Sequence, residues 1–311
     1  MFLALQIVGG FLGLLIGGDL LVRGASAIAV RLGMSPLVVG VVIVGFGTSV
    51  PELVTCVRAA LGGASGIAVG NIVGSNIANI LLILGAAALM RPFAASRHAV
   101  LRDGSIVIAS ALMFAAAAWT GTMGRVTGAV FVVLLIAYLV YTVRSDRKAA
   151  ASYDDVPAVE GTSLLMAIVA IVVGLILVLL GAEYLVNGAV VTARLFHVSE
   201  EVIGLTMVAV GTSLPELATS VVAAIRKHPE IALGNVLGSN VYNAVGIMGI
   251  TALVKPVPVS DTLRTVDIPL MVAISVLLVV MVATGRRVSR WEGAMLLALY
   301  GVYIGLQTQA A

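Results

Sequence analysis

The chain is poor in charged residues. Only 11% of its 311 residues are Asp, Glu, Lys or Arg, whereas 60% are hydrophobic and the mean hydropathy is +1.15. A soluble domain carries roughly 25% charged residues, so this composition cannot cover a water-facing surface. The net charge of +3 does not indicate a nucleic-acid partner, because the basic residues lie mostly between apolar runs, where they act as topology signals. The sequence predicts an integral membrane protein embedded in a lipid bilayer.

Cysteine is nearly absent, and the first residues lack a basic segment. Cys56 is the only cysteine, which excludes an internal disulfide. The N-terminal apolar stretch has no basic residues before it and no obvious cleavage site, so we expect a retained first span rather than a signal peptide.

Ten apolar segments can be drawn, which predicts an all-α integral membrane protein with ten transmembrane helices. Most are near the ~20 residues that cross the hydrocarbon core, and the first and sixth are long enough to require tilting. Their approximate limits are 2–32, 36–61, 65–90, 99–120, 124–143, 161–194, 199–225, 229–254, 263–285 and 290–308.

Two stretches, 45–79 and 209–243, repeat one pattern at a constant offset of 164 without insertion or deletion. Because five spans separate equivalent segments, the second half must enter the membrane in the opposite direction. This predicts two inverted five-helix repeats, 1–144 and 161–311, with a site near the midplane and a polar cytoplasmic linker at 145–160. The matching residues are Gly47, Thr48, Ser49, Pro51 and Glu52 with Gly211, Thr212, Ser213, Pro215 and Glu216, and Asn71, Ser75, Asn76 and Asn79 with Asn235, Ser239, Asn240 and Asn243.

Glu52 and Glu216 are the decisive pair. A carboxylate at the centre of a spanning helix costs about 2.5–3.5 kcal/mol on insertion scales. Arg58 is the nearest basic residue to Glu52, but its counterpart is Val222, so an ion pair does not explain both copies. A bound cation would explain the glutamate in both copies. The alternative, protonated glutamates hydrogen-bonded inside the bundle, leaves the duplicated neighbours unexplained.

The neighbouring residues fit cation binding. Pro51 and Pro215 clash with the carbonyls four residues earlier, so we expect helix kinks at Gly47 and Gly211 that free main-chain oxygens. Such backbone is tolerated at membrane depth only where it lines a cavity or the protein interior. The available ligands are carboxylate, amide, hydroxyl and carbonyl oxygens, which favour hard cations such as Ca²⁺ and Na⁺ and exclude a soft or imidazole site.

Another acidic pair, Asp19 and Glu183, is also 164 apart, but both lie near the end of the apolar core of their span, and we interpret them as structural or interfacial. Asp19 lies four residues before Arg23, a spacing suited to a local ion pair. Trp119 and Trp291 fall near span ends and are expected to be interfacial anchors.

At these motifs the chain resembles the calcium/cation antiporter superfamily, in particular its prokaryotic sodium/calcium exchanger-like branch. The resemblance rests on GTSVPE with GNIVGSNIAN and on GTSLPE with GNVLGSNVYN. It implies the sodium/calcium exchanger fold, alternating access around a central site, and exchange of Na⁺ for Ca²⁺ that exports Ca²⁺ across a prokaryotic inner or plasma membrane. It implies no prosthetic group and no obligatory protein partner.

The resemblance also implies a ligand set. The Ca²⁺ ligands would be the carboxylates of Glu52 and Glu216 and the main-chain oxygens of Thr48 and Thr212. The Na⁺ sites would use Ser49, Ser213, Ser75 and Ser239 with the main-chain oxygens of Gly45 and Ala209, and Asn79 and Asn243 would fill the remaining central positions. Relatives often carry Asp at the position of Asn243, so the neutral residue argues against K⁺ co-transport.

Two alternatives remain. A calcium/proton antiporter is the nearer one, although that branch tends to place an acid where this chain has Gly74 and Gly238. An intramembrane enzyme would need an activated nucleophile, and Ser49 and Ser213 have no His or Lys near them in sequence.

The basic residues predict the orientation in the membrane. With the N-terminus outside, 13 of the 18 basic residues fall in cytoplasmic connections, as the positive-inside rule requires. Tags placed at Met1 and Ala311 should therefore both be accessible from outside the cell, and a tag in the 145–160 linker only from the cytoplasm. A cytoplasmic terminus would contradict both this orientation and the count of ten spans.

Overall fold

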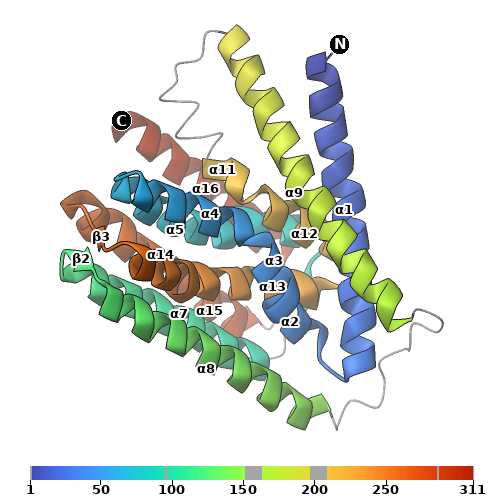
Figure 1. The fold of residues 1–311 in the computed structure, drawn as a ribbon. Coiled ribbons are helices and arrows are strands. Elements are labelled where there is room, and N and C mark those ends of the chain that lie inside the picture. Colours follow the sequence, from blue (N-terminus) through green and yellow to red (C-terminus); the bar gives the residue numbers. More distant parts are fainter. Residues whose placement is uncertain (1, 95–96, 151–162, 197–208, 286, 311) are drawn as a thin grey trace.

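The computed structural model describes residues 2–94, 97–150, 163–196, 209–285 and 287–310, and most of them are helical. Figure 1 shows the arrangement of the helices. The first half contains α1 (Phe2–Leu32), α2 (Pro36–Val39), the π-helical turn η1 (Gly40–Gly45), α3 (Phe46–Thr48), α4 (Val50–Leu61), α5 (Ser65–Ala78), the π-helical turn η2 (Asn79–Leu84), α6 (Gly85–Met90), α7 (Arg97–Trp119) and α8 (Arg125–Ala150).

The second half follows a similar order. It contains α9 (Leu164–Leu195), α11 (Ala209–Thr212), α12 (Leu214–Ile225), α13 (Pro229–Val241), the π-helical turn η4 (Tyr242–Ile247), α14 (Met248–Val254), the π-helical turn η5 (Leu263–Asp267), α15 (Ile268–Gly285) and α16 (Arg290–Ala310). The helix α8 continues to Ala150, so helical structure extends into the stretch expected to form the linker.

Within the described residues, seven helical segments are long and apolar enough to cross a membrane. The helices from Pro36 to Thr48 and from Val50 to Leu61 form an eighth span if they are taken together across their 43° bend. Part of the expected span 199–225 lies outside the described residues, and α12 covers its second part. The seven segments are Leu5–Leu32, Ser65–Met90, Leu101–Trp119, Arg125–Asp146, Leu164–Leu195, Pro229–Val254 and Leu263–Ala283.

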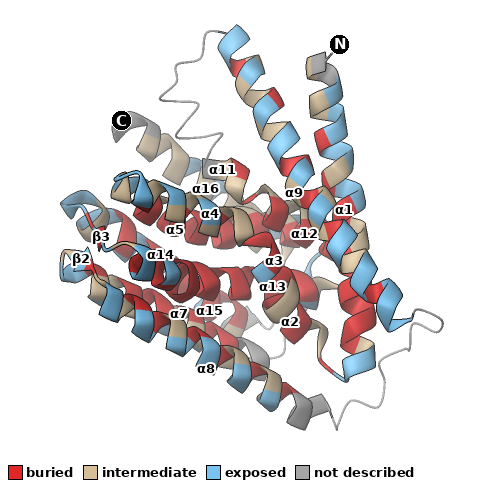
Figure 2. Cartoon of the chain, in the orientation of Figure 1, coloured by how far each residue is buried: buried red, intermediate tan, exposed pale blue. Residues whose placement is uncertain are grey.

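Two of these segments form the centre of the bundle. The segments Ser65–Met90 and Pro229–Val254 are 78% and 89% buried, whereas Leu164–Leu195 is only 22% buried. Figure 2 shows the same contrast between the buried α5 and α13 and the exposed outer faces of α8 and α9. The exposed faces are apolar, as expected where lipid replaces water. Because both central segments carry the second repeated motif, that motif lies in the core.

The long helices α1 and α9 pack closely along glycines. A Cβ atom at Gly10 would lie 2.8 Å from the carbonyl oxygen of Gly181, and one at Gly24 would lie 2.7 Å from that of Ala167. Residue numbers rise along α1 as they fall along α9, so the two helices run antiparallel. Figure 1 shows them diverging from the rest of the bundle at the end that holds the N-terminus.

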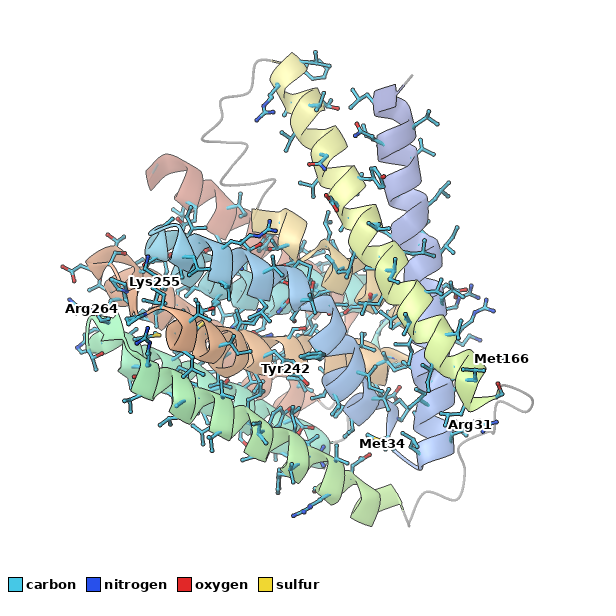
Figure 3. All side chains as sticks on the ribbon, in the orientation of Figure 1. Arg31, Met34, Met166, Tyr242, Lys255 and Arg264 are labelled. Atoms are coloured by element: carbon cyan, nitrogen blue, oxygen red, sulfur yellow. The ribbon has the colours of Figure 1, made fainter. Side chains whose placement is uncertain are left out.

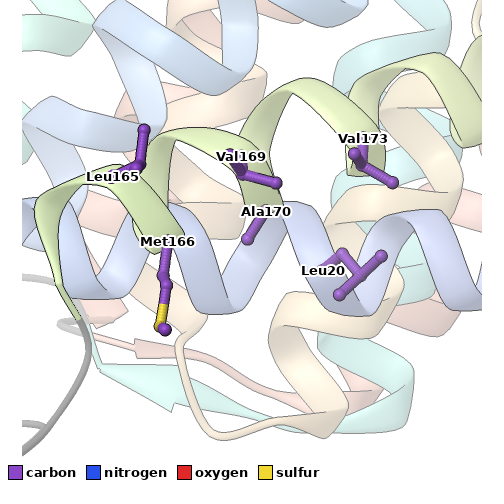
Figure 4. Close-up of a pocket in the computed structure, with 6 residues that line it drawn as sticks. All are labelled: Leu20, Leu165, Met166, Val169, Ala170 and Val173. Atoms are coloured by element: carbon purple, nitrogen blue, oxygen red, sulfur yellow. The ribbon is translucent and has the colours of Figure 1, made fainter.

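A groove of about 350 Å³ lies between this pair, near the start of α9 (Figure 4). All of its lining side chains are apolar, so it offers no cation ligand. They are Leu20, Leu165, Met166, Val169, Ala170 and Val173.

Two short strand pairs connect the halves, which an all-helical prediction did not include. The strand β1 (Phe93–Ala94) pairs antiparallel with β4 (Arg287–Val288), with Phe93 opposite Val288. The strand β2 (Thr122–Met123) pairs antiparallel with β3 (Val257–Pro258), with Met123 opposite Val257. Each pair therefore joins a helix end in one half to a helix end in the other.

Several basic residues lie near the ends of the bundle. In Figure 3, Lys255 and Arg264 lie at one end of the bundle, and Arg31 lies near the other. The expected local ion pair is confirmed, because Arg23 Nε lies 2.9 Å from Asp19 Oδ2. The same carboxylate also binds Arg226, at 2.5 Å, and thereby joins α1 to the end of α12.

The glycine packing of α1 and α9 predicts a position-specific loss of stability. In Gly17→Ala the new Cβ would lie 2.7 Å from the Gly174 carbonyl oxygen and 2.7 Å from the Val178 nitrogen, which are both main-chain atoms of α9. We expect a loss of about 1–3 kcal/mol of stability from overpacking, measured as a lower Tm in detergent micelles. Gly9→Ala is the matched control, since nothing lies within 4 Å of its Cβ. Equal Tm values for the two variants would contradict the packing.

Candidate cation-binding site

The site begins with two interrupted helices. Ser49 separates α3 from α4 with φ −83° and ψ 8°, and Ser213 separates α11 from α12 with φ −92° and ψ 4°. Pro51 and Pro215 lie in the first turn of the following helices, where a missing N–H is tolerated. The expected interruptions are therefore present, with a bend of 43° in the first half, but they fall at Ser49 and Ser213, two residues after Gly47 and Gly211, because each proline lies in the first turn of a new helix.

These breaks bring the two halves together in two matching clusters. Ser49 Oγ lies 3.2 Å from Glu216 Oε1 and 3.2 Å from Ser239 Oγ. In the second cluster Ser213 Oγ lies 3.5 Å from Glu52 Oε1 and 3.2 Å from Ser75 Oγ. Each residue of one cluster has its counterpart, 164 positions away, in the other. Each cluster therefore combines a serine from one half with a glutamate and a serine from the other.

Both carboxylates are removed from solvent. The side chains of Glu52 and Glu216 are 0% and 1% exposed, and none of the ion pairs found among the described residues involves either of them. Burying a charge without a partner is costly. Neutral hydroxyls are the side-chain partners of both carboxylates in the described structure, Ser213 for Glu52 and Ser49 with Thr48 for Glu216, so no positive charge compensates them there.

Six buried oxygen atoms in this region have no hydrogen-bond partner within the described structure. All six are acceptors, and they form three pairs related by the offset of 164. They are Oε2 of Glu52 and Glu216, Oδ1 of Asn76 and Asn240, and Oδ1 of Asn79 and Asn243. A buried acceptor without a donor costs about 1–3 kcal/mol. Oxygens that lack donors are the groups a bound hard cation would satisfy.

The threonines before the breaks contact asparagines of the opposite half. Thr48 Oγ1 lies 3.2 Å from Asn235 Oδ1, and Thr212 Oγ1 lies 3.3 Å from Asn71 Oδ1. Asn71 and Asn235 were not in the expected ligand set, nor were Asn76 and Asn240. The sequence signal that could have singled them out is their presence in both copies of the repeat.

The expected main-chain ligands differ between the halves. The carbonyl oxygen of Gly45 accepts the Ser49 N–H at 3.2 Å, four residues along. The Ser213 N–H donates to Val210, three residues back, at 3.1 Å, and not to Ala209. The Gly45 oxygen also lies 3.5 Å from Thr48 Oγ1, but that hydroxyl has a nearer acceptor in the Val44 oxygen at 3.0 Å, so a cation could take the second lone pair of the Gly45 oxygen.

Asn79 and Asn243 lie in π-helical turns. Asn79 opens η2 and Asn243 is the second residue of η4, and both side chains are buried. Such turns are rare and frequently occur at functional sites, because the extra residue changes the direction of neighbouring side chains. Among the described residues there is no group of three or more His, Cys, Asp or Glu side chains. Any cation site here is therefore built from two carboxylates with hydroxyl, amide and carbonyl oxygens.

Comparison with known proteins agrees with this chemistry. The family model described as sodium/calcium exchanger protein matches residues 2–144 and 166–309. The chain is 34% identical to the sodium/calcium exchanger MaX1 of Methanosarcina acetivorans over 95% of each chain. It is 35% identical to the putative antiporter CaxA of Alkalimonas amylolytica over 96% of this chain and 95% of that one.

A solved structure is similar over nearly the whole length. The sodium-calcium exchanger NCX_Mj, soaked with 2.5 mM Na⁺ and 0.1 mM Ca²⁺, superimposes with a TM-score of 0.83 and 33% identity over 98% of both chains. These similarities cover both halves and both clusters. The chain thus belongs to the sodium/calcium exchanger family, whose members are membrane transporters and not enzymes.

Proposed function

We propose that this protein is a secondary antiporter that exchanges Na⁺ for Ca²⁺ and exports Ca²⁺. The observation that carries the proposal is the pairing of two buried carboxylates, Glu52 and Glu216, with hydroxyls from the opposite half and with no basic side chain of the described residues. The two negative charges balance one Ca²⁺. Because Na⁺ is close to Ca²⁺ in size and also binds oxygen, the same cavity can accept either ion.

The buried charges also explain why exchange would be coupled. A transporter that closes over its site removes the carboxylates from water. Without a cation, this closure leaves two buried charges unpaired, which is strongly unfavourable. With Ca²⁺ or Na⁺ bound, the cost is compensated. The protein without a bound cation would therefore not change between its inward-facing and outward-facing states. Transport of Ca²⁺ in one direction would then require transport of Na⁺ in the other.

The ligand roles belong to the same proposal. Glu52 and Glu216 would bind Ca²⁺ together with the main-chain oxygens of Thr48 and Thr212. The Na⁺ ligands would be Ser49, Ser213, Ser75 and Ser239, with the main-chain oxygens of Gly45 and Ala209 and the side chains of Asn79 and Asn243. The unpartnered oxygens of Asn79 and Asn243 support a role as neutral ligands.

We further propose ten transmembrane helices in two inverted repeats, 1–144 and 161–311, joined by a cytoplasmic linker at 145–160, with both termini outside a prokaryotic inner or plasma membrane. The antiparallel packing of α1 against α9 supports the inversion, as do the two clusters related by the offset of 164. In this arrangement the helix breaks at Ser49 and Ser213 would lie near the midplane, where alternating access is built around a fixed site.

The carboxylates provide a direct test of cation binding. Glu52→Gln and Glu216→Gln keep the size of the side chain and remove one of the two charges that face a divalent ion. We expect Ca²⁺ transport to fall to background in proteoliposomes in both variants, with a Tm in detergent close to that of the wild type. Near-normal Ca²⁺ flux in either variant would contradict the proposal that both carboxylates bind Ca²⁺.

The coupling ion is tested by imposing one gradient at a time. Ca²⁺ uptake into proteoliposomes should follow an outward Na⁺ gradient, require no K⁺, and change in rate with membrane potential when unequal charge is exchanged. Asn79 and Asn243 are neutral, so no extra carboxylate is available to bind K⁺. Ca²⁺ uptake that proceeds equally well on a proton gradient in the absence of Na⁺ would favour a calcium/proton antiporter instead.

A further inference from the structure

Asn235 connects the interrupted helices of the two halves. From its position on α13, its Oδ1 atom lies 3.2 Å from Thr48 Oγ1 in the first half. Its Nδ2 atom lies 2.9 Å from Ser220 Oγ and 3.3 Å from the main-chain oxygen of Glu216 in the second half. One buried amide therefore touches the residue before the first break and the first turn of the helix after the second break.

The surroundings fix which way this amide points. The main-chain oxygen of Glu216 can only accept a hydrogen bond, so the group that faces it must be the NH₂ group of Asn235. The oxygen Oδ1 must then face Thr48. Two hydrogen bonds, to Ser220 Oγ and to the main-chain oxygen of Glu216, hold the amide in this orientation.

The oxygen of the Asn235 amide is one of several acceptors around the Thr48 hydroxyl. The described hydrogen-bond partners of Thr48 Oγ1 are the main-chain oxygens of Val44 at 3.0 Å and Gly45 at 3.5 Å, together with Asn235 Oδ1. All three are acceptors, and a hydroxyl has one hydrogen to donate. The Glu216 carboxylate is a further acceptor for this hydroxyl, so the Thr48 side chain is held between its own helix, Asn235 and Glu216.

The first half repeats this construction in a weaker form. Asn71 Oδ1 lies 3.3 Å from Thr212 Oγ1, and Asn71 Nδ2 donates to Cys56 Sγ at 3.3 Å. The thiol donates in turn to the Ala68 carbonyl oxygen at 3.4 Å, so its sulfur is the acceptor for the amide. Cys56 is the counterpart of Ser220, and sulfur is a weaker acceptor than a hydroxyl oxygen.

We propose that Asn235 and Asn71 are positioning residues, which hold the side chains of Thr48 and Thr212 so that their main-chain oxygens face a bound Ca²⁺, and which keep the two helix breaks in register across the halves. The proposal rests on the proposed cation exchange at this site. Asn235 is the stronger of the two, because its amide is held by a hydroxyl and a main-chain carbonyl, whereas the described acceptor for the Asn71 amide is a thiol.

The first test compares Ca²⁺ affinity with stability. Asn235→Leu keeps a similar volume and removes both ends of the amide. Loss of a residue that orients a metal ligand typically lowers affinity by about 10–100-fold, and we expect the Kd for Ca²⁺, measured by titration calorimetry in detergent, and the KM for Ca²⁺ uptake to rise in this range. Asn71→Leu should produce a smaller rise. Unchanged Kd and KM in a folded Asn235→Leu protein would overturn the proposal.

A second series leaves both Asn235 and the expected ligands in place. Ser220→Ala removes one of the two groups that hold the amide, so the Kd for Ca²⁺ should rise severalfold, and Ser220→Cys, which copies the first half, should restore part of the affinity. Ser275→Ala is the matched control, since Ser275 is equally buried but donates to Met271 within α15. Equal Ca²⁺ affinities in Ser220→Ala and the control would overturn the proposal, even if Asn235→Leu does not fold.

The same experiments separate this proposal from the proposed function. If the wild type exchanges Na⁺ for Ca²⁺ and the Asn235 and Ser220 variants bind Ca²⁺ as tightly as it does, only the positioning role fails. If the wild type binds Ca²⁺ but does not exchange it for Na⁺, the proposed exchange fails while the affinity series still tests positioning. If the wild type binds no Ca²⁺, both fail.

Discussion

Two buried carboxylates that have no basic partner among the described residues constrain the rest of this structure. A helix that carries Glu52 or Glu216 through the middle of a bilayer is unfavourable by itself. It becomes acceptable when other parts of the chain supply hydroxyls and when a cation is available to share the charge. The serines at both helix breaks, and the serines of α5 and α13 that meet them, fulfil the first condition.

The remaining helices keep this polar centre dry and in place. The central segments α5 to α6 and α13 to α14 are buried on nearly all sides, which is why their amide side chains lie away from lipid. The helices α1 and α9 approach each other through glycines, so a large apolar contact is made without bulky side chains between the backbones. The two strand pairs join opposite halves at the ends of the bundle. Polar chemistry is thus concentrated where the halves meet.

The sequence was sufficient for the class of protein and for several of the residues that the structure brings together between the halves. Composition alone indicated a membrane protein, and the exact repetition of one motif at an offset of 164 identified Glu52, Glu216 and the neighbouring serines. The local pairing of Asp19 with Arg23 also followed from spacing, because residues four apart share a helix face.

Other features depend on contacts that no spacing reveals. The repeat relates Ser49 to Ser213, but each serine contacts the glutamate of the opposite half. The spacing of residues within one half does not predict which residues of the other half they contact. The break at Ser49 was misplaced because a proline is compatible both with a kink and with the first turn of a new helix. The strands of two residues are too short to produce an alternating pattern, and the ion pair between Asp19 and Arg226 depends on how α1 packs against α12.

The contacts between the halves bear on how such a chain can arise. Each hydroxyl at a break is paired with a carboxylate, and each threonine with an amide, from the other copy of the repeat. A single copy would therefore contain parts of both clusters and would complete neither of them. If the halves descend from one duplicated unit, that unit could bind a cation only by associating with a second molecule of itself. Gene fusion would then have joined two units that already had to associate in order to bind a cation. Afterwards a substitution in one half could persist only if the contacts with the other half tolerated it. The difference between Cys56 and Ser220 is one such change, because each of these side chains contacts the asparagine that in turn contacts a threonine of the other half.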